Sequence, residues 1–379
     1  MRFFLLYRVM KRHEVPDVNT WNLHQLARAV SRNANDTQHA WSAIQEAYAW
    51  TERFEAYVDQ TILKRCVKDS LQVAIIAATE MSLDLPTAIA ALLTPPFLAG
   101  LIEAAAIEKR FGLKTASILK ELKALKSYRL RSDTIRNYPN HPDINCDHIL
   151  AILLQICDII RVHCSGITLE NLDSALIHSS AHLLLALKYF YIPLSHRMRM
   201  YDIQTKLADF WLKHTDTLSY YAITAKLGMT KIKRQQKLNL IAEEVQTALQ
   251  ARGIHFIIKK RIKSVYSIWH KIQKLKVNFD QIHDLTAIRI ILTHMDGKTL
   301  QEEKVACWRM LSIISNLYKP MCNIMRDWIS TPRDSSYESL HLTFETYKYG
   351  QLEVQIRTER MDYIAEHGEA SHWRYKYTL

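Results

Sequence analysis

The stretch STPRDSSYESLHLTFETYKYGQLEVQIRT, residues 330–358, decides how the C-terminal part of the chain folds. Polar and apolar residues alternate over residues 337–344 and again over residues 352–357. A period of two is typical of a β-strand that turns one face to a core and the other face away from it. Tyr349 and Gly350 lie between the two runs, so the pattern predicts an antiparallel hairpin.

The polar faces of this hairpin carry side chains that can do chemistry. Residues two apart in a strand lie about 7 Å from each other on the same side. Tyr337 and His341 therefore share a face of the first strand, and the second strand presents Glu353, Gln355 and Arg357 together. The simplest interpretation is a sheet with a solvated polar side. One acid, several cations and an aromatic ring also suit a charged ligand.

Charged residues outside the hairpin add to this set. Arg326 and Arg333 precede its first strand, and Asp284 precedes the β-branched run LTAIRIIL. A carboxylate at the end of a strand is well placed to hold Mg²⁺, which prefers oxygen ligands and often takes one or two carboxylates plus substrate phosphates. Glu353 is the natural second ligand, or a base, if the sheet brings the strands together. A capping or turn role is the alternative for Asp284.

A basic segment, KKRIKSVYSIWHKIQKLK, precedes both groups. Lys263, Ser267 and Lys271 recur every four residues, which predicts one stripe of a helix that could bind a polyphosphate. Arg261 belongs to the same segment, and a planar guanidinium stacks well on a nucleotide base. A solvated helix face is the alternative.

Composition and the order of elements favour two domains of different class. The 379 residues are 48% hydrophobic, include 8 glycines and carry a formal net charge of +12, which favours helices and partners that bear phosphates. Helical periodicity dominates the first half, and strands begin at about residue 255. We predict an α+β protein, with an all-helical domain over residues 1–195 and a mixed β-sheet domain with flanking helices over residues 196–379.

Two further features bear on the location of the protein. The sequence has no uncharged apolar stretch long enough to span a bilayer, so no membrane partner is expected. Its six cysteines show no metal-ligand spacing, which favours reduced thiols. A reducing cytoplasm is the simplest location.

Five segments, in order and spacing, resemble the synthetase domain of RelA/SpoT homologues, which make (p)ppGpp. They are RIKSVYSIWHKI, IHDLTAIRII, RDWISTPRDSSYESLH, LEVQIRT and AEHGEASHWRYK, dispersed over residues 261–376. The resemblance implies pyrophosphoryl transfer from ATP to the 3′-hydroxyl of GDP or GTP in the bacterial cytoplasm. It also implies a nucleotidyltransferase-like sheet and Mg²⁺ as cofactor.

The resemblance gives each candidate residue a role. Asp284 and Glu353 would hold Mg²⁺, and Glu353 would also take the ribose 3′-proton. Arg326 and Arg333, where the family usually has lysine, would face the transferred group. The residues implied for ATP are Arg261 and Arg289 around the adenine, with Lys263, Ser267 and Lys271 at the phosphates. The residues implied for GDP or GTP are Tyr337 on the guanine and His341 at phosphates, with Ser335 and Gln355 beside them.

The chain departs from the family's pattern just before Tyr337. The family usually has Asn-Gly there, and this chain has Ser335 and Ser336. Asparagine and glycine adopt a left-handed backbone more readily than serine. The loop that presents Tyr337 is therefore expected to shift, which would affect acceptor choice or rate.

The helical half resembles, more weakly, the hydrolase domain that precedes the synthetase in long members of the family. Thr94 and Pro95 stand where that domain has a metal-binding His-Asp pair. His178, His182 and His196 are scattered over helical sequence and are expected to be surface or core residues. We predict a degenerate hydrolase domain that serves as scaffold or regulator.

Other functions of the second half of the chain stay open. Some relatives modify the 3′ end of tRNA, and the basic charge would suit RNA. A nucleotide-binding regulator without catalysis and a plain RNA-binding module are the non-enzymatic alternatives, although neither requires both Asp284 and Glu353. Long members of the family engage ribosomes through further domains, so a ribosome or tRNA is an expected partner if this chain is part of a longer one. An oligomer is also left open.

Overall fold

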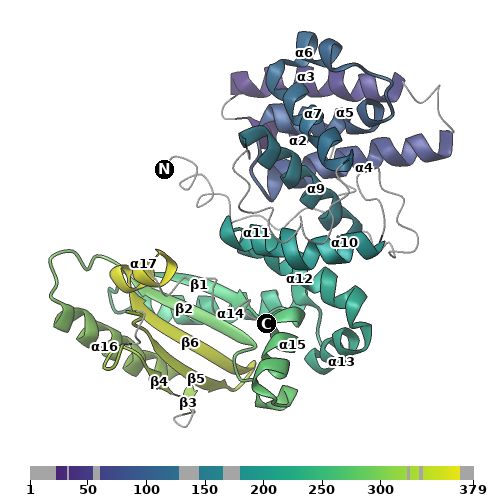
Figure 1. The fold of residues 1–379 in the computed structure, drawn as a ribbon. Helices are drawn as coiled ribbons and strands as arrows, with labels where there is room; N and C mark the ends of the chain where they lie inside the picture. The colour runs from purple at the N-terminus through teal and green to yellow at the C-terminus, as the bar shows by residue number, and fades with distance from the viewer. Residues whose placement is uncertain are drawn as a thin grey trace. The chain divides into compact units, whose positions relative to one another are not determined.

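The computed structural model describes residues 23–31, 34–53, 60–127, 145–164, 180–321, 325–332 and 336–367. The chain divides into two compact units, Met1–His214 and Thr215–Leu379. Figure 1 shows helices throughout the first unit and a sheet with flanking helices in the second. The predicted α+β class is confirmed, because strands occur in only one unit of the described chain.

The elements that the structure describes in the first unit are all helices. Its elements are α2 (Leu23–Val30), α3 (Ala34–Arg53), α4 (Gln60–Thr79), α5 (Leu85–Leu98), α6 (Ala104–Phe111), α7 (Leu113–Ser127), α9 (Cys146–Cys164), α10 (Ser180–Ala186), the π-helix η4 (Leu187–Tyr191), α11 (Ile192–Arg197) and α12 (Tyr201–Thr215). None of the helices that the structure describes is long and apolar enough to cross a membrane.

Local sequence signals explain where these helices begin and end. Asp84 caps α5, since its carboxylate accepts from the Thr87 backbone N–H at 3.3 Å and the Thr87 hydroxyl at 2.6 Å, and a proline occupies the first turn. Gly112 separates α6 from α7 with a φ of 90°, which a side chain would strain. Capping residues and glycines of this kind allow the limits of helices to be predicted from the sequence.

Helix α12 belongs to the first compact unit by its contacts. The ring of Phe210 packs edge-on against His163 of α9, with centroids 5.5 Å apart, and Lys206 pairs with Glu80. The unit therefore extends to His214. The sequence analysis placed the domain limit earlier, after residue 195, and the domain limits themselves stay a prediction.

The second unit combines helices with one mixed sheet. Its elements are α13 (Thr217–Leu227), α14 (Lys231–Gln250), β1 (Phe256–Ile262), α15 (Val265–Leu275), the 3₁₀ helix η5 (Phe279–Gln281), β2 (Thr286–Leu292), α16 (Leu300–Leu317), β3 (Lys319–Pro320), β4 (Arg326–Asp327), β5 (Leu340–Thr346), β6 (Gly350–Thr358) and α17 (Glu359–His367). The strand order is β1-β2-β6-β5-β3, with β4 also on β5. Only β2 and β6 pair in parallel among the described strands.

The predicted hairpin is β5 and β6. Its strands pair antiparallel from Leu340 opposite Ile356 to Thr346 opposite Gly350. Gly350 has a φ of 76°, so glycine supplies the left-handed conformation that the turn needs.

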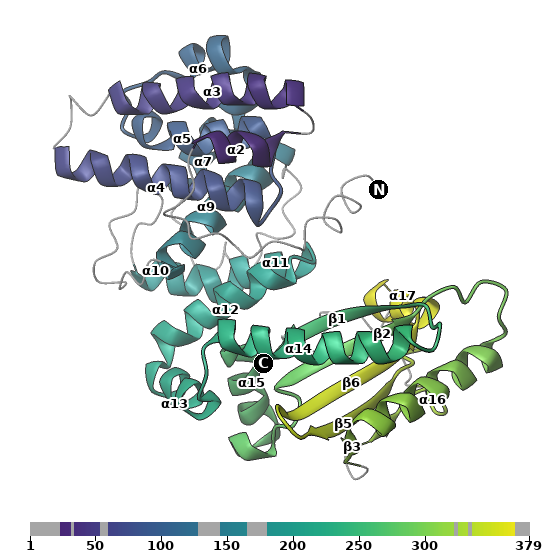
Figure 2. The same cartoon turned by 180° about the vertical axis from the view of Figure 1, so that it is seen from behind.

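One face of the sheet packs on α14 and α16, which Figure 2 shows in front of the strands. The apolar residues of the alternating pattern point to this side. They form a core with the two helices, including Leu238, Ile241, Ile288, Ile290, Met310, Ile314, Leu340, Leu342, Phe344, Leu352, Val354 and Ile356. The alternation predicted from sequence thus fixes which side chains remain for the other face.

The other face is polar but largely buried, which corrects the expectation of a solvated side. Strand register aligns His341, Gln355 and Arg289 across β5, β6 and β2. Glu353 is 8% exposed and Arg357 is 3% exposed. These groups are tolerated there because they contact each other and α17, and a buried charge needs such partners.

Candidate active site

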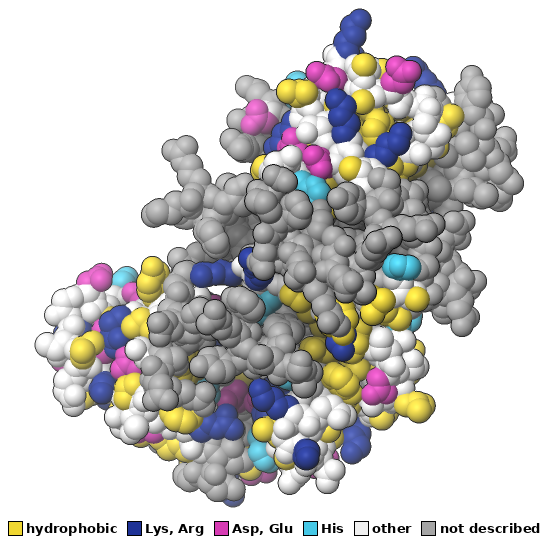
Figure 3. Space-filling view, viewed as in Figure 1, with side chains coloured by type: hydrophobic (Ala, Val, Ile, Leu, Met, Phe, Trp, Pro, Cys, Tyr) yellow, Lys and Arg dark blue, Asp and Glu magenta, His cyan; other side chains and the backbone are white. Residues whose placement is uncertain are grey.

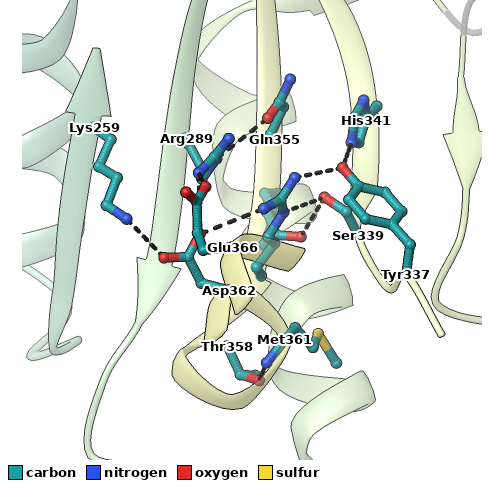
Figure 4. A network of polar contacts seen from close by, with 12 residues as sticks. Lys259, Arg289, Tyr337, Ser339, His341, Gln355, Thr358, Met361, Asp362 and Glu366 are labelled. Carbon is teal, nitrogen blue, oxygen red and sulfur yellow. Dashed lines mark hydrogen bonds and ion pairs between the residues drawn. The ribbon is translucent and has the colours of Figure 1, made fainter. Parts of the chain in front are cut away.

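The polar face of the sheet holds a continuous network of charged and hydrogen-bonding side chains. Figure 4 shows groups from β1, β2, β6 and α17 meeting beside Tyr337 and His341. In the view of Figure 3, cationic side chains lie next to acidic and histidine side chains over the second unit. The face is therefore a mixed-charge site rather than a uniformly basic surface.

Asp284 lies in the loop just before β2 and is paired with two lysines. Its carboxylate accepts from Lys271 at 2.9 Å and also from Lys263. Burial raises the pKa of Asp284, but the charges and hydrogen bonds of the two lysines lower it more, to about 2. Asp284 is thus ionised at neutral pH and is an ion-pair partner, not a helix cap.

The predicted helical stripe is wrong for Lys263. Ser264 caps α15 by accepting from the Ser267 backbone N–H at 3.1 Å, so the helix begins after Lys263. The Lys263 N–H donates to the Leu285 carbonyl at 3.0 Å, which continues the pairing of β1 with β2. Lys263 and Lys271 still reach the same carboxylate, one from a loop and one from the helix.

Glu353 lies on β6 opposite Ala287 of β2. Ala287 follows Asp284 by three residues in the sequence. Its carboxylate lies 3.2 Å from His341 Nδ1, and it accepts from the Gln355 amide at 3.2 Å. Burial raises the pKa of Glu353, and the Asp284 charge adds to this, but His341 lowers the pKa below its ordinary value. The two carboxylates are thus within electrostatic reach of each other.

Tyr337, His341 and Arg357 form a chain that ends at Glu353. The Tyr337 hydroxyl lies 2.9 Å from His341 Nε2 and accepts from Arg357, whose Cζ is 4.8 Å from the Tyr337 ring centroid. Burial lowers the pKa of His341, with Glu353 opposing it and the charges of Arg357 and Arg326 adding to it. A neutral His341 with a proton on Nδ1 donates to Glu353 and accepts from Tyr337.

Two acids of α17 complete the network and were missed from sequence. Asp362 accepts from Lys259 at 2.7 Å, from Arg289 at 3.1 Å and from Arg357 at 3.4 Å. Glu366 accepts from Arg289 at 2.7 Å. Their spacing of four residues on a helix that follows β6 was the available signal, since it places both on one helix face.

The structure brings most of the predicted site residues together. Those on or beside the polar face are Arg261, Lys263, Lys271, Asp284, Arg289, Arg326, Tyr337, His341, Glu353 and Gln355. The Ser267 hydroxyl instead accepts from Ser264 at 3.1 Å, within the first turn of α15. Arg333 and Ser335 lie outside the described residues.

The residue before Tyr337 adopts the conformation that the family's glycine would supply. Ser336 has a φ of 55°, in the left-handed region. A serine can occupy this region at some cost in strain. The expected shift of the loop stays a prediction, since the preceding serine lies outside the described residues.

The first unit presents its candidate residues differently. Thr94 is buried inside α5 and donates to the Ala90 carbonyl at 2.7 Å, and Pro95 follows it within the same helix. His196 is buried in α11 and packs edge-on against Tyr201, as a core residue would. Within the described residues no group of three or more His, Cys, Asp or Glu side chains is arranged to hold a metal. His178 lies outside them, and degeneracy stays a prediction.

Comparisons with known proteins found a matching family region and similar curated proteins. Residues 260–379 match the region found in RelA/SpoT proteins. The chain is 32% identical over 228 residues to a GTP pyrophosphokinase of Myxococcus xanthus, over 60% of this chain and 28% of that protein. It is 29% identical over 325 residues to the bifunctional (p)ppGpp synthase/hydrolase SpoT of Escherichia coli, over 85% of this chain and 43% of that protein.

A third relative is a probable guanosine-3′,5′-bis(diphosphate) 3′-pyrophosphohydrolase of Synechocystis sp., 29% identical over 71% of this chain and 34% of that protein. The chain spans less than half the length of each of these three relatives. The matched region contains the end of β1 and all of β2, β5, β6 and α17, which carry most of the polar network. By this region, the second unit is similar to RelA/SpoT proteins.

Proposed function

We propose that this chain transfers a pyrophosphoryl group from ATP to the 3′-hydroxyl of GDP or GTP. One observation carries the proposal: Asp284, in the loop before β2 and held by two lysines, and Glu353, on the neighbouring strand β6 and held by His341, are close enough for their charges to interact. Relatives named as a GTP pyrophosphokinase and as a (p)ppGpp synthase/hydrolase support it.

Glu353 is the proposed base for the acceptor hydroxyl. Its lowered pKa keeps it ionised at neutral pH, and His341 holds one of its oxygens in place. A base must be unprotonated and within hydrogen-bond reach of the proton that it takes. Phosphoryl-type transfer otherwise depends on positioning and charge neutralisation, which the surrounding lysines and arginines supply.

Asp284 and Glu353 also suit Mg²⁺ as donors. Mg²⁺ prefers oxygen ligands and is often held by one or two carboxylates together with substrate phosphates. Two nearby ionised carboxylates satisfy that donor set. When bound, the ion would neutralise phosphate charge and orient the transferred group.

The remaining residues divide between the two nucleotides in this proposal. Arg261 and Arg289 receive the adenine, because they lie on β1 and β2 on the polar face. Lys263, Ser267 and Lys271 are assigned to the phosphates of ATP. Tyr337, His341, Ser335 and Gln355 are assigned to the acceptor, and Arg326 and Arg333 to the transferred group.

We further propose that the first unit has lost hydrolysis and serves as scaffold or regulator. Thr94, which stands in the place of the family's metal-binding pair, supports this proposal, because it is buried and its hydroxyl donates to the Ala90 carbonyl at 2.7 Å.

Labelled ATP incubated with GDP or GTP, followed by thin-layer separation of the products, tests the main proposal. We expect a labelled guanosine product, and at least about a 100-fold slower rate for Glu353→Gln because the base is removed. Glu359→Gln is the matched control, since Glu359 is an exposed glutamate at the start of α17. Full activity of Glu353→Gln would remove this residue from the mechanism.

The same assay distinguishes the second candidate function, a pyrophosphokinase that acts on tRNA. A net charge of +12 is compatible with a tRNA acceptor. Deacylated tRNA is therefore used in place of GDP in a parallel reaction. Label on tRNA and none on GDP or GTP would overturn the main proposal in favour of a tRNA pyrophosphokinase.

A further inference from the structure

The Asp362 carboxylate lies where three cations converge. Oδ2 accepts from Lys259 of β1, and Oδ1 accepts from Arg289 of β2 and from Arg357 of β6. Asp362 is 8% exposed and Arg357 is 3% exposed. Figure 4 shows this carboxylate between the strands, with Arg289 on one side and the chain to Tyr337 on the other.

The cations need this acid to stay in place. Arg289 and Arg357 lie on neighbouring strands and on the same sheet face, and like charges at such range repel each other. Arg357 is buried, so an uncompensated charge there would be costly. One oxygen of this carboxylate accepts from both guanidinium groups, at 3.1 Å and 3.4 Å, so a single negative charge holds the two cations beside each other.

We propose that Asp362 is a positioning residue for both nucleotides, an inference that rests on the proposed function. Through Arg289 it fixes a group that faces the base of ATP. Through Arg357 it fixes Tyr337, since Arg357 donates to the Tyr337 hydroxyl and lies over the ring. Donor and acceptor sites therefore share one anchor on α17.

The neighbouring acid offers a matched comparison. Glu366 accepts from Arg289 at 2.7 Å and lies one helical turn after Asp362. Through this contact, Glu366 acts on the donor side of the network. Loss of charge at Glu366 should therefore affect one nucleotide, whereas loss of charge at Asp362 should affect two.

Equilibrium binding tests this inference without any reaction. Isothermal titration with α,β-methylene-ATP and, separately, with GDP compares the whole chain with its Asp362→Asn and Glu366→Gln variants. We expect Asp362→Asn to weaken binding of both ligands by about tenfold, as loss of a charge-assisted hydrogen bond does. We expect Glu366→Gln to weaken the ATP analogue alone.

Wild-type affinity of Asp362→Asn for either ligand would overturn the inference, even if its melting temperature falls. If Asp362→Asn does not fold, Asp362→Glu is used in its place, which moves the carboxylate by one methylene. Unchanged binding of both ligands by Asp362→Glu would also overturn the inference. A wild-type chain that binds both ligands but forms no product refutes the proposed function and leaves Asp362 as an anchor for binding. A chain that binds neither ligand overturns both.

Discussion

Ser336 holds a left-handed backbone, with a φ of 55°, directly before Tyr337. A side chain in this region costs roughly 1 kcal/mol or more relative to glycine. The strain is retained where Tyr337 must be presented to Arg357 and His341. A strained residue that sets the direction of an aromatic side chain is a common feature of binding sites.

We expect Ser336→Gly to stabilise the protein by about 1 kcal/mol, because glycine adopts this backbone without a Cβ clash. Urea unfolding measures the change. Ser330→Gly is the control: Ser330 is also exposed and is not among the residues with positive φ, so glycine there should lower stability slightly. Equal shifts for the two variants would contradict strain at Ser336.

At the residue scale, the sequence pointed to side chains that the structure brings near each other, but it did not give all of their positions. Asp284 and Glu353 were singled out by their types and by their place beside strands, and the structure brings them near each other. The position of Lys263 was misjudged, because a four-residue repeat does not reveal where a helix starts. The cap at Ser264 does.

At the scale of elements, the alternation over β5 and β6 predicted the hairpin and the core face correctly. It could not predict that the polar face would be buried. That burial depends on α17, whose acids Asp362 and Glu366 reach strands β1, β2 and β6. Contacts between elements far apart in sequence leave no local periodicity, so they cannot be predicted from the pattern of residues.

The docking of α17 should depend on pH through Asp362. Burial raises the pKa of this carboxyl, but the hydrogen bond from Lys259 and the charges of Arg289, Lys259 and Arg357 bring it below the ordinary value of 3.8. The stabilisation is therefore complete above the unfolded-state pKa and is lost as pH falls through the lowered folded-state pKa.

We expect the wild-type advantage in unfolding free energy over Asp362→Asn to be constant at neutral pH and to shrink below about pH 4. Denaturant titrations at several pH values measure it. Asp280→Asn, at an exposed carboxylate, controls for general acid effects. An advantage that grows as the pH falls would show that Asp362 is not a stabilising anion.

At the scale of the whole molecule, the two units differ in class and in where the candidate site lies. The site lies entirely in the second unit, and the region matched by the family model lies there too. The helical periodicity of the first half predicted its class correctly. Whether that unit still hydrolyses (p)ppGpp is a question about a few side chains, which periodicity does not address.

Loss of hydrolysis is the prediction that belongs to this scale. The aligned relatives include proteins named as pyrophosphohydrolases, so the similarity of the chain as a whole favours that activity. One side chain argues against it: Thr94, in the place of the family's metal-binding pair, is buried inside α5 and bonded to the Ala90 carbonyl.

Purified protein incubated with Mn²⁺ and labelled ppGpp should therefore leave the nucleotide intact over hours, in the same preparation that makes labelled product from ATP and GDP. Synthesis in that preparation shows that the second unit is folded and active. Release of pyrophosphate that is abolished by a chelator would show that the first unit retains a working metal site. That result would overturn the predicted loss of hydrolysis.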